Sequence, residues 1–128
     1  MVAATGVTEQ GQGTEAIIRQ IVAEAVGVAI EQVRVITGDT LTTPYGGGTW
    51  ACRGAGIGGE SALQSGLAVK EAALKVAGAM LQAAPDALDL VNGEIVDRSS
   101  GQARMPLAEL SRIVYFAAIR CRPTCRAS

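Results

Sequence analysis

The stretch from residue 38 to residue 60, GDTLTTPYGGGTWACRGAGIGGE, limits the possible folds more than any other part of the chain. It holds eight of the sixteen glycines and the only tryptophan, and its apolar residues follow neither a helical nor a strand period. Connections longer than about 12–15 residues are usually binding loops or disordered segments. Tyr45, Trp50 and Ile57 favour a binding loop. Since glycine allows close approach of the main chain, we expect a surface of backbone N–H groups that suits an anion.

Composition limits the remaining possibilities. The chain has 128 residues, 48% of them hydrophobic, which is enough for one domain with its own core. The formal net charge of −1 argues against a protein that binds nucleic acid or a membrane surface through bulk positive charge. No apolar run approaches the roughly 20 residues of a membrane span, and the N-terminus lacks the pattern of a signal peptide. We therefore expect a soluble, cytoplasmic protein with neither nucleic acid nor a membrane as a partner.

Hydrophobic periodicity predicts regular elements on both sides of this stretch. They are a strand at residues 2–6, a helix at 14–25 stopped by Gly27, a strand at 33–37, a long helix at 61–82, two strands joined by Asn92-Gly93, a short strand at 102–105, and a helix from Pro106 to about Ile119. The first three elements form a β-α-β unit with parallel strands, and Asn92-Gly93 is typical of a type I′ hairpin turn. We therefore predict an α+β fold, a single two-layer domain with a mixed sheet.

The residue types present exclude several kinds of catalytic site. There is no histidine, so a Ser/His/Asp or Cys/His arrangement and a zinc site with imidazole ligands are excluded. Cys52, Cys121 and Cys125 have the spacing of neither a disulfide framework nor a strong metal motif, so free thiols are the simplest interpretation. Asp39 could act as a base, but capping of its own downstream backbone is favoured. We therefore name no catalytic and no metal-binding residue.

Two short segments have the residue types of an anion site. The Gly-Gln-Gly sequence at 11–13 precedes a helix, where free N–H groups and the helix dipole favour an anion, although an ordinary turn and cap explains the same residues. The glycines at 46–48 are followed by Thr49 and Arg53, whose guanidinium could hold a phosphate or simply solvate the loop. In a β-α-β unit both segments could lie at one end of the sheet, where ligands usually bind. Together they suggest the phosphate of a large cofactor.

The order of these motifs resembles a known family. The segments that carry the resemblance are TEQGQGTE at 8–15, QIVAE at 20–24, VRV at 33–35, GDT at 38–40, PYGGGT at 44–49 and CR at 52–53. They resemble the molybdenum-binding large subunit of the xanthine dehydrogenase, aldehyde oxidase and carbon monoxide dehydrogenase family of oxidoreductases. The resemblance covers about residues 2–116, and the ordered set is far more specific than any single motif. We therefore divide the chain into a molybdopterin-binding-like α+β domain at 1–116, partial relative to the family, and an irregular tail at 117–128.

The resemblance implies a bound molybdopterin cytosine dinucleotide. In this family the glutamine of the Gly-Gln-Gly turn contacts the pterin end of the cofactor, and a second loop approaches it with hydroxyl and main-chain donors. The cofactor-binding residues implied for this chain are Gly11, Gln12, Gly13, Thr49, Cys52, Arg53 and Gly54. Because Cys52 stands where a serine is common, Thr49, Arg53 and backbone amides are the expected donors in the second loop.

The resemblance also implies that this chain is one piece of a larger subunit. The segment with a phenylalanine beside the metal, the glutamate that serves as general base and the residues that select the substrate have no counterpart here, nor have the iron–sulfur and flavin domains. We therefore expect a fragment that is inactive alone, whose parent catalyses oxidative hydroxylation with iron–sulfur and flavin subunits as partners. The alternative is a stand-alone domain without cofactor that pairs with a second copy, because apolar faces normally covered by the rest of the subunit favour association.

Overall fold

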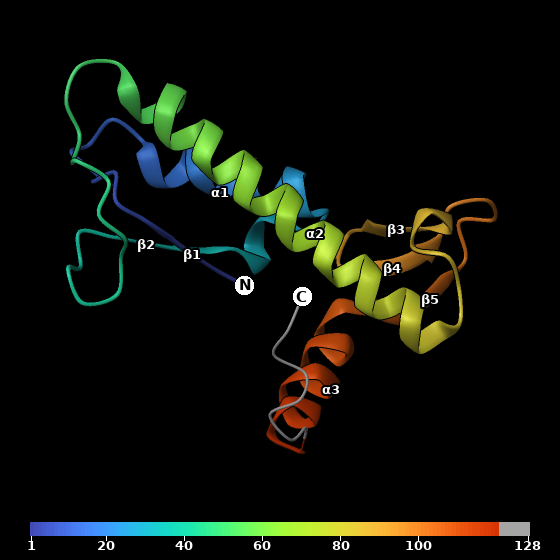
Figure 1. Cartoon of the computed structure of the whole chain (residues 1–128). Helices are drawn as coiled ribbons and strands as arrows, with labels where there is room; N and C mark the ends of the chain where they lie inside the picture. Colours follow the sequence, from blue (N-terminus) through green and yellow to red (C-terminus); the bar gives the residue numbers. More distant parts are fainter. Residues whose placement is uncertain (121–128) are drawn as a thin grey trace. The chain divides into compact units, whose positions relative to one another are not determined.

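The structure is a computed structural model and describes residues 1–120 (Figure 1). Its elements are β1 (Val2–Thr5), α1 (Thr14–Val26), η1 (Ile30–Gln32), β2 (Arg34–Thr37), η2 (Gly54–Gly58), α2 (Gly59–Leu81), η3 (Pro85–Ala87), β3 (Leu88–Val91), β4 (Glu94–Asp97), β5 (Ala103–Pro106) and α3 (Leu107–Arg120). They divide into two compact units, of which the first is Met1–Ala72 and the second begins at Ala73. The α+β class predicted from the sequence is confirmed.

The first unit contains the predicted β-α-β arrangement. β1 and β2 are parallel, in a register that pairs Val2 with Arg34 and Thr5 with Thr37. α1 connects them, and its apolar stripe at Ile18, Val22 and Val26 is buried. Glycine bounds this helix at both ends: Gly13 and Gly27 have φ values of 83° and 89°, a backbone conformation that L side chains rarely adopt. The helix therefore begins and ends where the sequence predicted.

Small residues let α2 approach α1 closely. A Cβ added at Gly66 would lie 2.7 Å from Ala25 Cβ, and one added at Gly59 would lie 2.9 Å from Ile21 Cδ1. The predicted leucine face of α2 is less complete than expected, because Leu67 is 45% exposed whereas Leu74 is buried. Close contact through glycine and alanine, rather than interdigitated leucines, therefore joins the two helices in this unit.

The second unit is built on a three-stranded antiparallel sheet in the order β3-β4-β5. Asn92 and Gly93 form its hairpin turn with φ values of 51° and 80°, as predicted for a type I′ turn. Its core contains Leu88, Leu90, Ile95 and Leu110, all at most 2% exposed. Pro106 ends β5, and α3 begins one residue later than predicted.

Three details of the predicted architecture need correction. The strands form two separate sheets instead of one mixed sheet. The glycine-rich stretch is irregular only in its first part, because the π-helical turn η2 begins at Gly54 and leads directly into α2. The tail predicted to be irregular from residue 117 is helical as far as Arg120, and its remaining residues, including Cys121 and Cys125, lie outside the described part of the chain. Within residues 1–120, no helix has the length and apolarity needed to cross a membrane.

Candidate functional site

The two segments predicted to bind one ligand lie against each other. We call residues 8–13 the α1 turn and residues 46–53 the glycine loop. The Thr49 hydroxyl donates to the carbonyl oxygen of Thr8 at 2.6 Å and accepts from the backbone N–H of Thr8 at 2.8 Å. The side chain of Gln10 adds a bond from Nε2 to the carbonyl oxygen of Thr49 at 3.3 Å. Residues 41 positions apart are thus joined by both backbone and side-chain groups.

Glu9 occupies the N-terminus of α1 in this structure. Its carboxylate accepts hydrogen bonds from the backbone N–H groups of Gly11 at 2.7 Å, Gly13 at 3.1 Å and Glu15 at 3.0 Å. The Glu15 N–H bond is the largest of the effects that lower the pKa of the Glu9 carboxyl below its usual range. The α1 turn therefore does bind an anion, but that anion is the chain's own carboxylate, and this favours the turn-and-cap interpretation of Gly11 and Gly13.

Gln12 directs its side-chain amide into the same turn. Its Oε1 accepts from the backbone N–H of Gln10 at 2.7 Å, and its Nε2 donates to Thr14 Oγ1 at 2.7 Å and to the carbonyl oxygen of Thr8 at 3.3 Å. Both ends of the amide are thus engaged locally. Gln12 remains exposed, so a ligand can reach it if hydrogen bonds to the ligand replace these local bonds.

Arg53 is held differently from the residues of the α1 turn. Its guanidinium carbon lies 5.1 Å from the centroid of the Trp50 ring, and Nη1 donates to the carbonyl oxygen of Gly47 at 3.4 Å. Its Nε is buried and has no hydrogen-bond partner. A buried guanidinium N–H without a partner is costly, so a shift of the side chain that brings Nε to an acceptor would be favourable; the Nε of Arg19 in α1 is also buried without a partner.

The backbone of the glycine loop has conformations that few residues adopt. Gly47 and Gly48 have φ values of 72° and 73°, and Ala51, which has a side chain, has a φ of 51°. The base of the loop is fixed where Gly46 crosses Gly6, because a Cβ added at Gly46 would lie 2.6 Å from the backbone carbon of Gly6. The tie at Thr49 and this crossing fix the loop on both sides of Gly47 and Gly48.

Asp39 is a cap, as favoured from the sequence. Its carboxylate accepts from the hydroxyl of Thr42 at 2.6 Å and from the backbone N–H of Leu41 at 2.9 Å. The Thr42 hydroxyl, followed by the Leu41 N–H, holds the pKa of this carboxyl below its usual value. A carboxylate stabilised in its ionised form is a poor general base, so Asp39 belongs to the turn at the start of the glycine-rich stretch.

The remaining predicted residues lie at the start of η2. Gly54 approaches α1, since a Cβ added there would lie 3.6 Å from Thr14 Oγ1. Cys52 is an exposed free thiol. Among residues 1–120 no group of three or more cysteine and acidic residues could hold a metal ion. The structure therefore brings together the α1 turn, Thr49, Arg53 and Gly54 in one unit.

Sequence analysis missed two residues that shape this site. Glu9 was part of a motif but received no role, although an acidic residue close to a helix N-terminus is a recognised signal for capping. Trp50 was noted only as evidence for an ordered loop, and its position three residues before Arg53 gave no sign of the ring contact. Thr8 could not be found from local sequence, because its partner Thr49 is distant along the chain.

Comparison with known proteins identifies the family. The model of the molybdopterin cofactor-binding domain matches residues 1–126. The 6-hydroxypseudooxynicotine dehydrogenase complex subunit gamma of Paenarthrobacter nicotinovorans is 38% identical over 98 residues, which are 77% of this chain and 12% of that protein. The xanthine dehydrogenase molybdenum-binding subunit of Escherichia coli O157:H7 is 39% identical over 93 residues, 72% of this chain and 12% of that protein.

A solved structure gives the same result. Quinoline 2-oxidoreductase from Pseudomonas putida 86 superimposes with a TM-score of 0.78 and 32% sequence identity, covering 92% of this chain and 15% of that chain. The chain therefore belongs to the molybdopterin cofactor-binding domain family of the molybdenum hydroxylases. It spans about an eighth of the length of the curated relatives it matches.

The donors of the glycine loop fit a part of this cofactor. The Arg53 Nε is a buried donor without a partner, and no atom lies within 4 Å of a Cβ position at Gly48, so an anionic group can approach the backbone there. The α1 turn fits less directly, because Glu9 already accepts the N–H groups of Gly11 and Gly13. The glycine loop thus keeps one buried donor without a partner, whereas the N–H groups of Gly11 and Gly13 already bind Glu9.

Proposed function

We propose that this domain supplies one side of a molybdopterin cytosine dinucleotide site in the large subunit of a molybdenum hydroxylase. Arg53, Thr49 and the backbone of Gly47 and Gly48 would hold a phosphate group, and Gln12 would face the pterin end. The observation that carries this proposal is the unpartnered, buried Arg53 Nε in a loop tied to the α1 turn. When bound, the cofactor would supply the redox chemistry of oxidative hydroxylation at its metal.

The same proposal makes the domain inactive by itself. A ligand of this size is normally buried over 70–90% of its surface, and one pair of loops covers it from one side only. The remainder of the pocket, the general base and the iron–sulfur and flavin partners would come from the rest of the large subunit and from other subunits. Within this chain the role of Arg53, Thr49 and Gln12 is to bind and orient the cofactor.

The single tryptophan offers a direct test of this site. Trp50 lies beside Arg53, so its fluorescence reports on the glycine loop alone. Adding molybdopterin cytosine dinucleotide, released from a purified molybdenum hydroxylase, should change the Trp50 emission saturably. Arg53→Met should weaken this binding by about tenfold or more, because a charge-assisted hydrogen bond is lost.

One control tests whether the glycine loop is the binding site, and another tests which nucleotide form of the cofactor binds. Arg34→Met removes an exposed arginine of β2, outside both loops, and should bind like the wild type. Cytidine diphosphate should compete better than guanosine diphosphate if the dinucleotide is the cytosine form. An unchanged Trp50 emission, or equal binding by Arg53→Met and wild type, would contradict the proposed site.

A second function remains supported by exposed apolar side chains. Leu41, Tyr45 and Trp50 are 94%, 99% and 65% exposed on the glycine-rich stretch. Such side chains favour contact with another protein surface, which could be the rest of the subunit or a second copy. Light scattering on the cofactor-free protein tests the second copy: a stable dimer that binds no cofactor would support an oligomerising domain in place of a cofactor site.

A further inference from the structure

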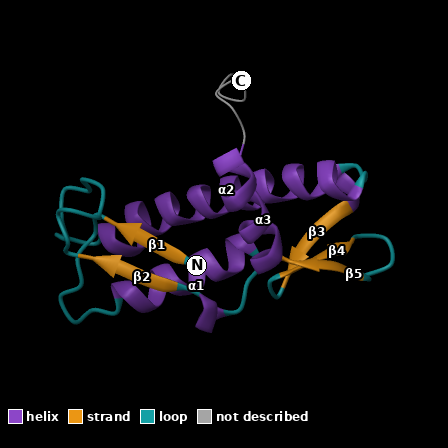
Figure 2. Cartoon of the chain, turned by 90° about the horizontal axis from the view of Figure 1, so that it is seen from below, coloured by secondary structure: helices purple, strands orange, loops and turns teal. Residues whose placement is uncertain are grey.

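Asn92 is the only asparagine in the chain, and a glycine follows it. It lies in the turn that joins β3 to β4, two strands that run side by side in the sheet of the second unit (Figure 2). Its φ of 51° is in the left-handed region, which asparagine tolerates better than most residues with a side chain. Asn92 is exposed, and its side-chain amide makes no hydrogen bond within residues 1–120.

Gly93 places a backbone nitrogen next to this side chain. The ladder of the hairpin pairs Val91 with Glu94, so the N–H of Gly93 belongs to the turn and lies outside the ladder. Glycine has no Cβ that could block the approach of this nitrogen to the Asn92 side chain. The nitrogen of Gly93 and the Cγ of Asn92 belong to consecutive residues, so a reaction between them is intramolecular and is favoured by proximity.

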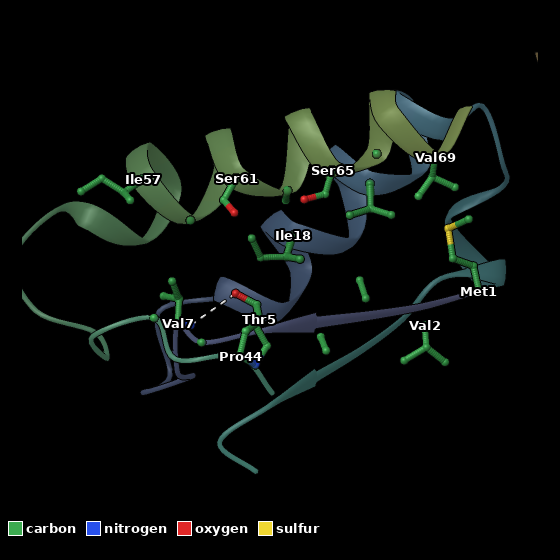
Figure 3. A pocket seen from close by; sticks show the side chains of 18 of the residues that line it. Met1, Val2, Thr5, Val7, Ile18, Pro44, Ile57, Ser61, Ser65 and Val69 are labelled. Atoms are coloured by element: carbon green, nitrogen blue, oxygen red, sulfur yellow. Dashed lines mark hydrogen bonds between the residues drawn. The ribbon is translucent and has the colours of Figure 1, made fainter. Parts of the chain in front are cut away.

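The groove of the first unit contains no comparable pair of reacting groups. It has a volume of about 550 Å³ and includes the hydroxyls of Thr5, Ser61 and Ser65 (Figure 3). Neither a carboxylate nor a histidine side chain lines this groove, so no side-chain base is present to activate a hydroxyl. Cys52 is an exposed thiol, and it is the only cysteine among residues 1–120. The hairpin turn is therefore the place where the described chain brings a nucleophile and an electrophile together.

We propose that Asn92 is a site of spontaneous deamidation in the folded protein. The nitrogen of Gly93 loses its proton and forms a bond to Asn92 Cγ, while the bond from Cγ to Nδ2 breaks and ammonia leaves. Water then adds to one of the two carbonyl carbons of the resulting succinimide and breaks the bond from that carbon to the Gly93 nitrogen. The product is an aspartyl or an isoaspartyl residue, and no oxidant or reductant is needed. The reaction is independent of the proposed cofactor site, because all its groups belong to the second unit.

Ring closure requires the turn to open but does not require the domain to unfold. The succinimide fixes the Asn92 backbone in a conformation that differs from that of the type I′ turn, so the tip must open before the ring can close. Asn92 and Gly93 add no pair to the ladder of β3 and β4, and Asn92 is exposed. Local opening at such a loop tip requires little free energy compared with the unfolding of core strands.

The two products have different effects on the link between the hairpin and α3. The N–H of Leu107, the first residue of α3, donates to the carbonyl oxygen of Gly93 at 2.8 Å. Aspartate tolerates the left-handed region, so the aspartyl product keeps the turn and this bond. Isoaspartate adds one carbon to the main chain before Gly93, so the connection no longer fits a two-residue type I′ turn. The isoaspartyl product should therefore lose the bond from Leu107, and both products add one negative charge to a formal net charge of −1.

Timed incubation followed by peptide mapping with mass spectrometry measures the conversion of Asn92. The rate in the folded protein should stay constant at urea concentrations below the unfolding transition, because local opening exposes little surface. Asn92→Gln should react at least about tenfold more slowly, because its longer side chain must close a larger and less favourably placed ring. A rate that rises in proportion to the unfolded fraction, or a reaction confined to the unfolded chain, would overturn deamidation of the folded protein.

Hydrogen exchange of the Leu107 amide, measured by NMR, tests the effect on α3. Anion exchange isolates the deamidated protein by its added charge, and enzymatic methylation of isoaspartate identifies the isoaspartyl form. Asn92→Asp provides the aspartyl form alone, and its Leu107 amide should exchange at the wild-type rate. The Leu107 amide of the isoaspartyl form should exchange at least about fivefold faster. Equal exchange in the isoaspartyl form and the wild type would show that the turn keeps its bond to α3, and would overturn this part of the proposal.

Discussion

The α1 turn and the glycine loop contain the same kind of groups but satisfy them differently. In the α1 turn, Glu9 and Gln12 accept or donate bonds to backbone and side-chain groups of the turn itself. In the glycine loop, the Nε of Arg53 has no partner, and Ala51 has a backbone conformation that is unfavourable for a residue with a side chain. A closed network stabilises the fold, whereas an unsatisfied one costs stability and is retained where a ligand completes it.

This difference changes which part of the predicted site is expected to contribute binding energy. A ligand at the α1 turn must displace Glu9 or exchange with the bonds of Gln12, so part of its interaction energy is offset. A ligand at the glycine loop gains the Arg53 donor without displacing a partner. The two regions are nevertheless coupled, because Thr49 holds the loop against Thr8. Substitutions in each region should therefore separate stability from binding.

The largest effect should come from breaking the tie between the two regions. Thr49→Val removes the hydroxyl that bonds to the N–H, the carbonyl oxygen and the hydroxyl of Thr8. Leaving these partly buried backbone groups without partners should lower the free energy of unfolding by about 1–3 kcal/mol. Urea denaturation followed by circular dichroism measures this change. Thr40→Val, at an exposed position, is the matched control, and an equal loss in both variants would show that the tie has no particular role.

Local sequence was sufficient wherever the controlling interactions are local. The caps of α1 at Gly13 and Gly27 and the Asn92-Gly93 turn were predicted because each depends on the φ angle that a single residue type accepts. The parallel pairing of β1 and β2 was predicted from the β-α-β order of the elements. The family was also recognisable, since the motifs occur in a specific order.

The parts that sequence did not predict depend on contacts between distant residues. No local pattern distinguishes one mixed sheet from the two sheets observed, because strand partners are chosen by packing. The Thr8–Thr49 tie joins residues 41 positions apart, and the state of Arg53 depends on which acceptors the folded loop places nearby. The Glu9 cap is an exception, because its partners lie within six residues and the acidic residue before the helix was a local signal that was missed. Both loops were predicted to meet one ligand, and the structure shows that the N–H groups of Gly11 and Gly13 already have a partner in Glu9 whereas the Arg53 Nε has none.

A smaller effect, visible in the pH dependence of stability, should come from the α1 turn. The pKa of the Glu9 carboxyl is lowered in the folded state from its ordinary 4.5. Its contribution to stability is therefore present above the unfolded pKa and is lost as the pH falls through the folded pKa. Glu9→Gln should unfold at lower urea concentration than wild type at pH 7, and the two midpoints should converge as the pH is lowered below about 4.5.

The control for this comparison lies on the same helix. Glu24→Gln changes an exposed carboxylate near the other end of α1, away from the free N–H groups. Its midpoint should follow that of wild type at every pH. Asp39 and Asp97, whose pKa values are also lowered, are present in both proteins and contribute equally to both curves of midpoint against pH. A gap between Glu9→Gln and wild type that persists at low pH would show that the carboxylate acts by shape rather than by charge.

The smallest effect on stability should come from the glycine loop. Arg53→Met removes the contact with the Trp50 ring but also removes the buried Nε that has no partner. The contact with the mostly exposed Trp50 ring contributes about 0.5–1 kcal/mol and the long Nη1 bond to Gly47 adds little, whereas an unsatisfied buried donor costs about 1 kcal/mol or more, so these changes offset each other and the free energy of unfolding should fall by less than about 1 kcal/mol. A double-mutant cycle with Trp50→Leu isolates the ring contact. If Arg53→Met instead destabilises the protein as much as Thr49→Val does, the guanidinium stabilises the loop through contacts within the chain. The polar groups of the glycine loop would then be satisfied as fully as those of the α1 turn.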